Sequence, residues 1–165
     1  GMQVTNAFMT SYAQQKRSWY MFFFQIPFAD VALAHDDYAF LEHLWHDWSP
    51  GWEFPREEMA ALKDTFRQPG VAQAALGYYR AMLDPTQQDP ALAELQSRML
   101  MEPIAVPALM LHGADDGCMG AELVAGMEAY FPRGLRVEIV SGTGHFLHQE
   151  DPGRVNALVL DFLLS

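Results

Sequence analysis

Two short polar motifs near the C-terminal end of the sequence have the residue types needed for acid–base chemistry. Asp116 lies in the segment His-Gly-Ala-Asp-Asp-Gly, and His145 follows in Gly-Thr-Gly-His-Phe. Each motif comes directly after a predicted strand, and side chains at the carboxyl ends of parallel strands face the crevice in which α/β proteins bind ligands. An acid and a histidine in this order predict the general-base half of a nucleophile–acid–histidine triad. The plain alternative is that each motif is only a turn.

Two predicted strands and two predicted helices position this pair. Residues 106–111 are an apolar run typical of a strand buried on both faces, whereas residues 135–140 alternate apolar and charged side chains, which indicates one solvated face. Apolar stripes at helical spacing predict helices over residues 121–131 and 151–164. This order predicts parallel strands joined by a right-handed crossover. Two parallel strands are too few to be covered on both faces, so they indicate the edge of a larger sheet.

The preceding hundred residues predict only helices. Apolar residues recur at helical spacing, and Pro and Gly residues mark where the segments end. The predicted helices span residues 37–48, 55–68 and 71–83, with a fourth that begins at residues 89–90. We therefore divide the chain into a helical region, residues 1–102, and a C-terminal β-α-β-α part, residues 103–165.

The composition argues against several classes of partner. The 165 residues are 50% hydrophobic and carry a net charge of −11, which is apolar enough for one folded domain and too negative to attract phosphate backbones or anionic lipid. We therefore expect no nucleic-acid and no membrane partner, and no apolar run is long enough to span a bilayer. The single cysteine, Cys118, cannot form an internal disulfide and suits a reducing cytoplasm.

A metal site on a helix is a second hypothesis for the chemistry. Potential ligands cluster in one stretch, at His35, Asp36, Asp37, His43, His46 and Asp47. His43 and His46 lie three residues apart on one predicted helix, an acceptable spacing for two ligands. Histidines on a polar helix face are more often solvated, however, so we expect neither a metal nor another cofactor.

The segment from Pro107 to Leu164 resembles the end of an α/β-hydrolase. In that family a Gly-x-x-Asp motif carries the triad acid, which the resemblance assigns to Asp116. A Gly-x-Gly-His-Phe motif followed by Glu-x-Pro carries the triad base, which the resemblance assigns to His145, with Glu150 completing the pattern. The resemblance implies an incomplete α/β-hydrolase fold, with a helical cap followed by two parallel strands and their crossover helices.

From about residue 12 onward, the helical region is similar to the cap of epoxide hydrolases. The string Ser-Trp-Tyr-Met-Phe-Phe-Phe-Gln around Tyr20 resembles the entry to that cap, and Gly-Tyr-Tyr-Arg around Tyr79 resembles its second motif. In the family these two tyrosines donate hydrogen bonds to the epoxide oxygen. Two phenols aimed at one oxygen can stabilise the alkoxide that forms when the ring opens. The plain alternative is that both tyrosines are core residues.

A group of aromatic side chains is expected to line the pocket for an apolar substrate. These residues are Trp19, Phe23, Phe24 and Phe146. If the site is complete, the resemblance implies a small apolar, epoxide-like molecule as the ligand. An aromatic stripe at helical spacing is also what a hydrophobic core produces.

The nucleophile of this family is missing from its proper place. It is an aspartate in a Gly-x-Asp-x-Gly turn that precedes the cap, and this sequence begins almost at the cap. The segment from Gly113 to Gly117 spells the same motif by chance. If Asp115 were the nucleophile, a separate acid would have to follow on another strand before His145, and no suitable carboxylate does.

We therefore expect a chain that is inactive alone or is completed by another polypeptide, because a histidine–acid pair without a nucleophile cannot form the ester intermediate. An uncovered strand edge favours pairing with a second copy or with a missing N-terminal half. The alternatives from other classes are a helical metal-binding module and a dimeric module without catalytic activity.

Overall fold

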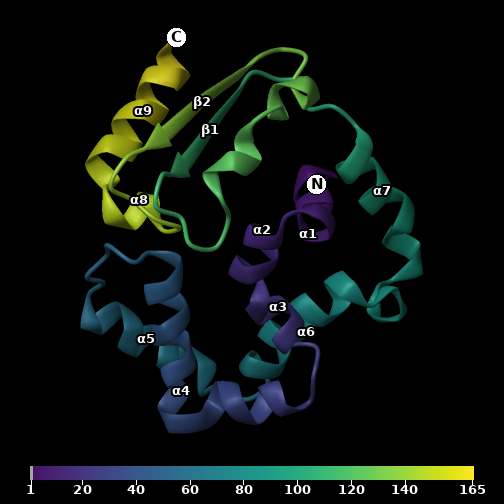
Figure 1. The fold of residues 1–165 in the computed structure, drawn as a ribbon, viewed down its shortest axis with the longest axis vertical. Helices are drawn as coiled ribbons and strands as arrows, with labels where there is room; N and C mark the ends of the chain where they lie inside the picture. Colours follow the sequence, from purple (N-terminus) through teal and green to yellow (C-terminus); the bar gives the residue numbers. More distant parts are fainter. Residues whose placement is uncertain (1) are drawn as a thin grey trace.

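The chain begins as a run of helices and ends as a small parallel sheet with its connecting elements, as Figure 1 shows. The computed structural model describes residues 2–165, with side chains from residue 6 onward. The α-helices are α1 (Met2–Thr10), α2 (Tyr12–Arg17), α3 (Trp19–Phe23), α4 (Phe28–Trp48), α5 (Arg56–Phe66), α6 (Val71–Leu83), α7 (Ala93–Met101), α8 (Leu147–Glu150) and α9 (Pro152–Leu164). The 3₁₀ helices are η1 (Pro85–Gln87), η2 (Pro90–Leu92), η3 (Ala121–Val124) and η4 (Met127–Tyr130). No helix among residues 2–165 is long and apolar enough to cross a bilayer.

The two strands, β1 (Ala108–Gly113) and β2 (Leu135–Val140), pair in parallel, with Ala108 opposite Leu135 and Gly113 opposite Val140. This confirms the predicted topology. The prediction that the first strand is buried on both faces was wrong, because residues 108–111 are only half-buried and Val106 is 58% exposed. The physical reason is that the sheet of the described residues has only two strands, so part of its surface has no layer packed against it.

The crossover between the strands differs from the predicted helix over residues 121–131. Two short 3₁₀ helices, η3 and η4, replace it, and Gly126 lies between them with a φ of +81°. A left-handed residue ends a right-handed helix, and glycine adopts that conformation at little cost. The apolar spacing of the segment is therefore realised as two turns rather than as one α-helix.

Helix α4 contains a sharp break that the sequence analysis did not anticipate. Asp36, Asp37 and Tyr38 all have left-handed backbone angles, with φ between +48° and +59°. Contacts with the end of α5 hold this break in place: the Arg67 guanidinium binds both carboxylate oxygens of Asp37 at 2.7 Å, and the Tyr38 hydroxyl donates to the Phe66 carbonyl at 2.8 Å. The regular helical part predicted over residues 37–48 therefore starts after Tyr38. Helix α6 has the bounds that the sequence predicted.

The core of the helical region extends as far as the loop that follows β1. Its buried members come mainly from α3, α4, α5 and α6, and Cys118 from the loop belongs to the same cluster. They are Tyr20, Met21, Phe24, Ala29, Leu33, Leu41, Leu44, Met59, Leu76 and Cys118. The helical region and the sheet region thus share a hydrophobic contact at the loop that carries Asp116.

The ends of the two strands lie close together at Gly113. A Cβ atom on this residue would come within 2.1 Å of the Gly144 carbonyl oxygen and 2.6 Å of the Thr143 carbonyl oxygen. Both of these atoms are backbone atoms in the loop after β2, so they cannot move aside as a side-chain tip would. Glycine at position 113 lets the two loops approach each other.

We predict that Gly113→Ala lowers the free energy of unfolding by about 1–3 kcal/mol, the usual cost of overpacking. The matched control is Gly77→Ala inside α6, where no atom lies within 4 Å of the new Cβ. That substitution should raise the free energy of unfolding by about 0.5–1 kcal/mol, because alanine is the better helix former. Urea denaturation followed by circular dichroism measures both, and equal effects of the two substitutions would contradict this account of Gly113.

Candidate active site

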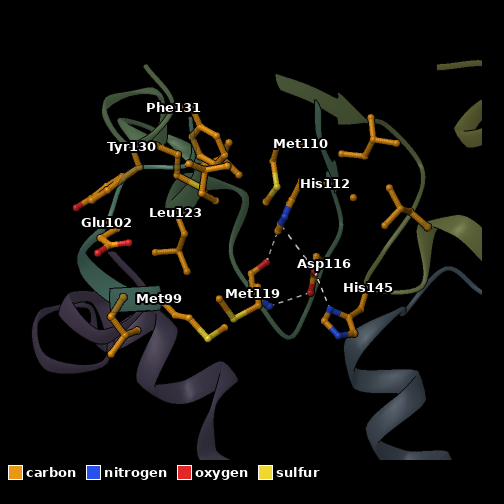
Figure 2. Close-up of a pocket in the computed structure, with 17 residues that line it drawn as sticks. Met99, Glu102, Met110, His112, Asp116, Met119, Leu123, Tyr130, Phe131 and His145 are labelled. Atoms are coloured by element: carbon orange, nitrogen blue, oxygen red, sulfur yellow. Dashed lines mark hydrogen bonds and ion pairs between the residues drawn. The ribbon is translucent and has the colours of Figure 1, made fainter. Parts of the chain in front are cut away.

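Asp116 and His145 form a hydrogen-bonded pair at the carboxyl ends of the strands. The Nδ1 atom of His145 donates to Oδ2 of Asp116 at 3.0 Å, and Figure 2 shows the two side chains pointing toward each other. Asp116 follows β1 and His145 follows β2, so the parallel pairing of the strands brings together two residues that are 29 positions apart. The sequence analysis singled out both residues, and the structure places them in contact.

The second oxygen of Asp116 is held by its own loop. Oδ1 accepts hydrogen bonds from the backbone N–H groups of Cys118 at 2.7 Å and Met119 at 2.8 Å. His112 supports the loop from the other side, since its Nε2 donates to the Met119 carbonyl at 3.0 Å. Burial raises the pKa of Asp116, but the hydrogen bonds from His145 and from the loop outweigh it and hold the pKa below its ordinary value. Asp116 is therefore a fixed, ionised acceptor.

The environment of His145 favours its protonated form. Burial lowers the pKa of the imidazole, but the hydrogen bond to Asp116 and the interactions with Cys118 outweigh this effect and raise the pKa to about 10. At neutral pH both ring nitrogens therefore carry a proton. The ring must lose one of them before it can act as a general base.

Three residues that the sequence analysis did not assign a role hold the loop of His145. Glu150 accepts from the backbone N–H groups of Gly144 at 2.7 Å and Phe146 at 3.0 Å, on either side of the histidine. Ser49, which is fully buried, donates to Glu150 at 2.7 Å, and the Trp48 carbonyl accepts from the His145 N–H at 3.1 Å. Glu150 was noticed only as part of the Glu-x-Pro pattern. The structure gives it a physical task, which is to anchor the backbone around His145.

The two cap tyrosines lie side by side next to this pair. The rings of Tyr20 and Tyr79 meet edge to face with centroids 5.7 Å apart, and the Tyr20 hydroxyl lies 3.3 Å from Sγ of Cys118. The ligand atoms of Cys118, Asp116 and His145 all lie within 4.8 Å of one another. The tyrosine rings thus touch each other directly, and the buried thiol lies between Tyr20 and the acid–histidine pair.

Burial keeps both phenols protonated. It is the main cause that raises the pKa of Tyr20, with Cys118 adding to it, and it is also the main cause that raises the pKa of Tyr79. Tyr79 is positioned by the residue that follows it, because the Arg80 guanidinium donates to the Phe24 carbonyl at 2.9 Å and pairs with Asp30 at 2.7 Å. The Tyr-Arg motif thus joins α6 to the end of α3.

The four aromatic residues expected to line one pocket lie in different places. Phe24 lines an apolar cavity of about 220 Å³ together with Tyr79. Trp19, Phe23 and Phe24 all pack on Phe40, and Trp19 also borders a separate, more polar hollow. None of the three cavities described is lined by all four residues. Phe146, the fourth member, packs against the indole rings of helix α4 and the following turn, beside His145.

A second apolar cavity, of about 360 Å³, opens on the side of β1. Its wall is mostly apolar and comes from α7, β1 and the two 3₁₀ helices of the crossover, with Asp116 and His145 among the lining residues (Figure 2). Met99, Leu123 and Phe131 lie opposite the acid–histidine pair in this view. The pair is thus accessible from an apolar hollow.

The helical metal hypothesis receives no support from the geometry. His43 and His46 are exposed, and neither belongs to a group of three close ligands among the described residues. The ring of His46 packs on Phe54, with centroids 4.7 Å apart. Within the part of the chain that the structure describes, three other side chains lie close enough together to share an ion. They are Asp116, Cys118 and His145.

A buried glutamine that the sequence analysis missed joins the helical region to the loop of Asp116. Gln14 is completely buried; its side chain donates to the Cys118 carbonyl at 2.9 Å and accepts from the Gly120 N–H at 3.0 Å. A polar residue on a helix gives no sign in the sequence that it will be buried. Only the packing of α2 against a loop more than one hundred residues away reveals its role.

Known proteins of similar sequence are mainly epoxide hydrolases. The chain is 29% identical to human "Epoxide hydrolase 4" over 157 residues, which cover 92% of this chain and 40% of that protein. It is 29% identical to "Epoxide hydrolase 2" of Caenorhabditis elegans, and 28% identical to "AB hydrolase superfamily protein YfhM" of Bacillus subtilis, of which it covers 41% and 49%. The chain thus spans less than half the length of these relatives. No family model matches it.

Solved structures agree with this on the fold. The epoxide hydrolase of Bacillus megaterium, solved with an inhibitor, superposes with a TM-score of 0.78 at 23% identity, covering 99% of this chain and 57% of that one. The Cif epoxide hydrolase of Acinetobacter nosocomialis has a TM-score of 0.64 at 23% identity, covering 88% and 44%. The chain is therefore similar to the C-terminal part, cap and last strands, of an α/β-hydrolase of the epoxide-hydrolase type, and its fold is an incomplete α/β-hydrolase fold.

Proposed function

We propose that this chain provides the proton-handling half of an epoxide hydrolase, with Tyr20 and Tyr79 as hydrogen-bond donors to the substrate and His145 with Asp116 as the general-base pair. One observation carries the proposal: Tyr20 and the acid–histidine pair converge on Cys118, and Tyr79 packs directly on Tyr20, so that groups from four different segments meet at one place. Core packing alone gives no reason for two phenols to meet an ionised carboxylate and an imidazole at one place.

The first step opens the epoxide ring. A carboxylate forms a bond to one epoxide carbon, the carbon–oxygen bond breaks, and a tyrosine gives its proton to the oxygen that leaves. The raised pKa values of Tyr20 and Tyr79 keep both phenols protonated before the reaction, so each is available to donate a hydrogen bond to that oxygen. Hydrogen-bond donors that are already in place stabilise the developing negative charge without reorganisation.

The second step hydrolyses the ester that the first step forms. Neutral His145 takes a proton from water, and the water oxygen attacks the ester carbonyl. The bond between the carbonyl carbon and the alcohol oxygen breaks, and that oxygen takes the proton from His145 as the diol leaves. The new carboxyl group gives its proton to the phenolate of the first step, so the carboxylate and the tyrosine are both restored. Asp116 holds Nδ1 of the ring, so Nε2 is the nitrogen that faces the water. Since the pKa of His145 is about 10, the ring is protonated at neutral pH in this chain and is not ready for the step.

The carboxylate nucleophile has to come from outside these 165 residues. Asp115 has the right residue type, but its side chain is exposed. Its backbone N–H donates a hydrogen bond to the Thr143 carbonyl at 2.9 Å, and it is the direct neighbour of Asp116, which already orients His145. Asp116 cannot act as the nucleophile while it orients His145. The short span of the chain against its relatives supports a source in a further part of the fold.

The partner that supplies the nucleophile would cover apolar surface on α7 and on the segment that leads into β1. Large apolar side chains are exposed on these elements, including Met99 at 77%, Met101 at 60% and Val106 at 58%. An N-terminal half of the same fold would add strands next to this surface and bury it. In its absence, we propose that a second copy of the chain covers the same surface. The unpaired, buried Cys118 supports a reducing compartment such as the cytoplasm.

We predict that the isolated chain does not turn over epoxides, because the ester route lacks its nucleophile. Fused behind the first half of an epoxide hydrolase of the same fold, the chain should gain activity. In the fusion, His145→Gln should lower kcat by about 10²–10⁴-fold, and Tyr79→Phe by about 10²–10³-fold. An epoxide hydrolysis assay measures all of these.

The matched control for Tyr79 is its neighbour Tyr78, which is 69% exposed and should tolerate replacement by phenylalanine without loss of activity. Turnover by the isolated chain that disappears in Asp116→Asn would contradict the proposal. It would mean that a residue within this chain supplies the nucleophile.

A second prediction concerns the stability of the pair as the pH changes. The pKa of His145 is about 10 in the folded chain and 6.5 as its ordinary value. The interactions that raise this pKa stabilise the folded state as long as His145 is protonated. Their contribution is complete below about pH 6.5 and is lost as the pH rises toward about 10. The wild type should therefore lose its stability advantage over His145→Gln across this interval.

Denaturation curves of both proteins at several pH values measure this difference. The Asp116→Asn variant is the companion, since it removes the main partner that raises the pKa, and a histidine titration by NMR should then move toward the ordinary value. A difference between wild type and His145→Gln that is constant over the interval would disprove the coupling.

A further inference from the structure

The close group of Asp116, Cys118 and His145 has a property beyond proton transfer. It joins a carboxylate oxygen, a thiol sulfur and an imidazole nitrogen, all within 4.8 Å of one another. We propose that these three side chains bind a divalent transition-metal ion of the zinc type, and that the ion takes the place of the proton between Asp116 and His145.

The distances are close to those that such an ion requires. Tetrahedral zinc sites have metal–nitrogen and metal–oxygen bonds of about 2.0–2.1 Å, so the two ligand atoms lie about 3.3 Å apart. The present distance between Oδ2 of Asp116 and Nδ1 of His145 is 3.0 Å, so they need to separate only slightly. The sulfur lies within 4.8 Å of both atoms, and a tetrahedral site with a zinc–sulfur bond of about 2.3 Å would place it about 3.6 Å from them.

The surroundings orient the ligands as outer contacts do in metal sites. The backbone N–H groups of Cys118 and Met119 occupy Oδ1 of Asp116, which leaves Oδ2 as the binding atom. The Tyr20 hydroxyl lies 3.3 Å from the sulfur and can donate to it once the thiol is deprotonated. One carboxylate oxygen and the sulfur are thus supported from outside the group.

An ion has a route to the group and room for a fourth ligand. Asp116 and His145 line the cavity of about 360 Å³, and the His145 side chain is 32% exposed. Cys118 lies behind them and is only 5% exposed, so the ion would enter from the cavity side. A water molecule in the cavity can fill the fourth position, as in zinc sites with three protein ligands.

The donor set selects the class of ion. Mg²⁺ and Ca²⁺ prefer oxygen ligands, whereas thiolate and imidazole favour zinc and its softer neighbours. The net charge of −11 attracts cations to the surface in general. A bound ion would break the hydrogen bond between Asp116 and His145, so metal binding and general-base action exclude each other at this place.

The test uses Co²⁺ as a spectroscopic substitute for Zn²⁺ on the full chain. Cys118 is the only cysteine, so a thiolate-to-Co²⁺ charge-transfer band in the near ultraviolet can arise only from this residue. We expect the band to saturate at one ion per chain and to disappear when Zn²⁺ displaces the cobalt. Because the band is read on the wild type, the test does not depend on whether any variant folds, and it needs no epoxide activity.

Two variants make the assignment specific. Cys118→Ser should abolish the band and weaken Zn²⁺ binding by at least about tenfold, the loss that even an outer contact of a metal site costs when removed. The control is the double variant His43→Gln, His46→Gln, which removes the exposed histidine pair on α4 and should leave the band unchanged. Absence of the band in the wild type, or loss of Zn²⁺ binding in the histidine control instead, would overturn the proposal.

Discussion

The carbonyl oxygen of Trp48, at the end of helix α4, is the point on which the site depends. The last carbonyls of a helix have no partner within it. This one accepts from the backbone N–H of Gly117 at 3.0 Å and from that of His145 at 3.1 Å. One oxygen therefore fixes both loops, the one that follows β1 and the one that follows β2. The distance between Asp116 and His145 is set from the helical region as well as from the sheet.

The glycines of the two motifs serve this arrangement. A Cβ on Gly117 would come within 1.9 Å of the Asp47 carbonyl oxygen, and one on Gly144 within 2.6 Å of the Ser49 Cα. Both glycines have ordinary backbone angles, so their role is close approach to the end of α4 rather than a special turn. Of the two glycines before His145, only Gly142 has a positive φ, +76°. Gly142 thus makes the sharp turn, whereas Gly144 allows the close contact with Ser49.

Cys118 connects the tyrosines of the helical region with the acid–histidine pair. Its sulfur lies in the cap core and touches the Tyr20 hydroxyl, while its backbone N–H holds Asp116. If the metal proposal holds, a proton and a soft metal ion compete for the same atoms around it. In our two proposals the imidazole and the carboxylate serve either as a proton-transfer pair or, together with the thiol, as ligands, whereas the phenols serve only as donors. Its burial also shields the group from bulk solvent, which strengthens every electrostatic interaction within it.

The sequence by itself determined the order of the helical region and the two strands, and the bounds of some elements. Hydrophobic periodicity located α6 and β2 with their exact bounds, and the order of strand and crossover predicted the parallel pairing that brings Asp116 to His145. These are local or topological properties, so they can be read without knowledge of packing. Where a single local feature overrode the period, as at Gly126 in the crossover, the prediction failed.

Only the tertiary structure decided how the cap meets the strand loops. The contact between Tyr20 and Cys118 joins residues 98 positions apart, and that between Ser49 and Glu150 joins residues 101 positions apart. No periodicity encodes such pairs, because they arise when helices pack and buried polar groups must find partners. The same physics distributes the aromatic rings, since they pack wherever the core has room for them.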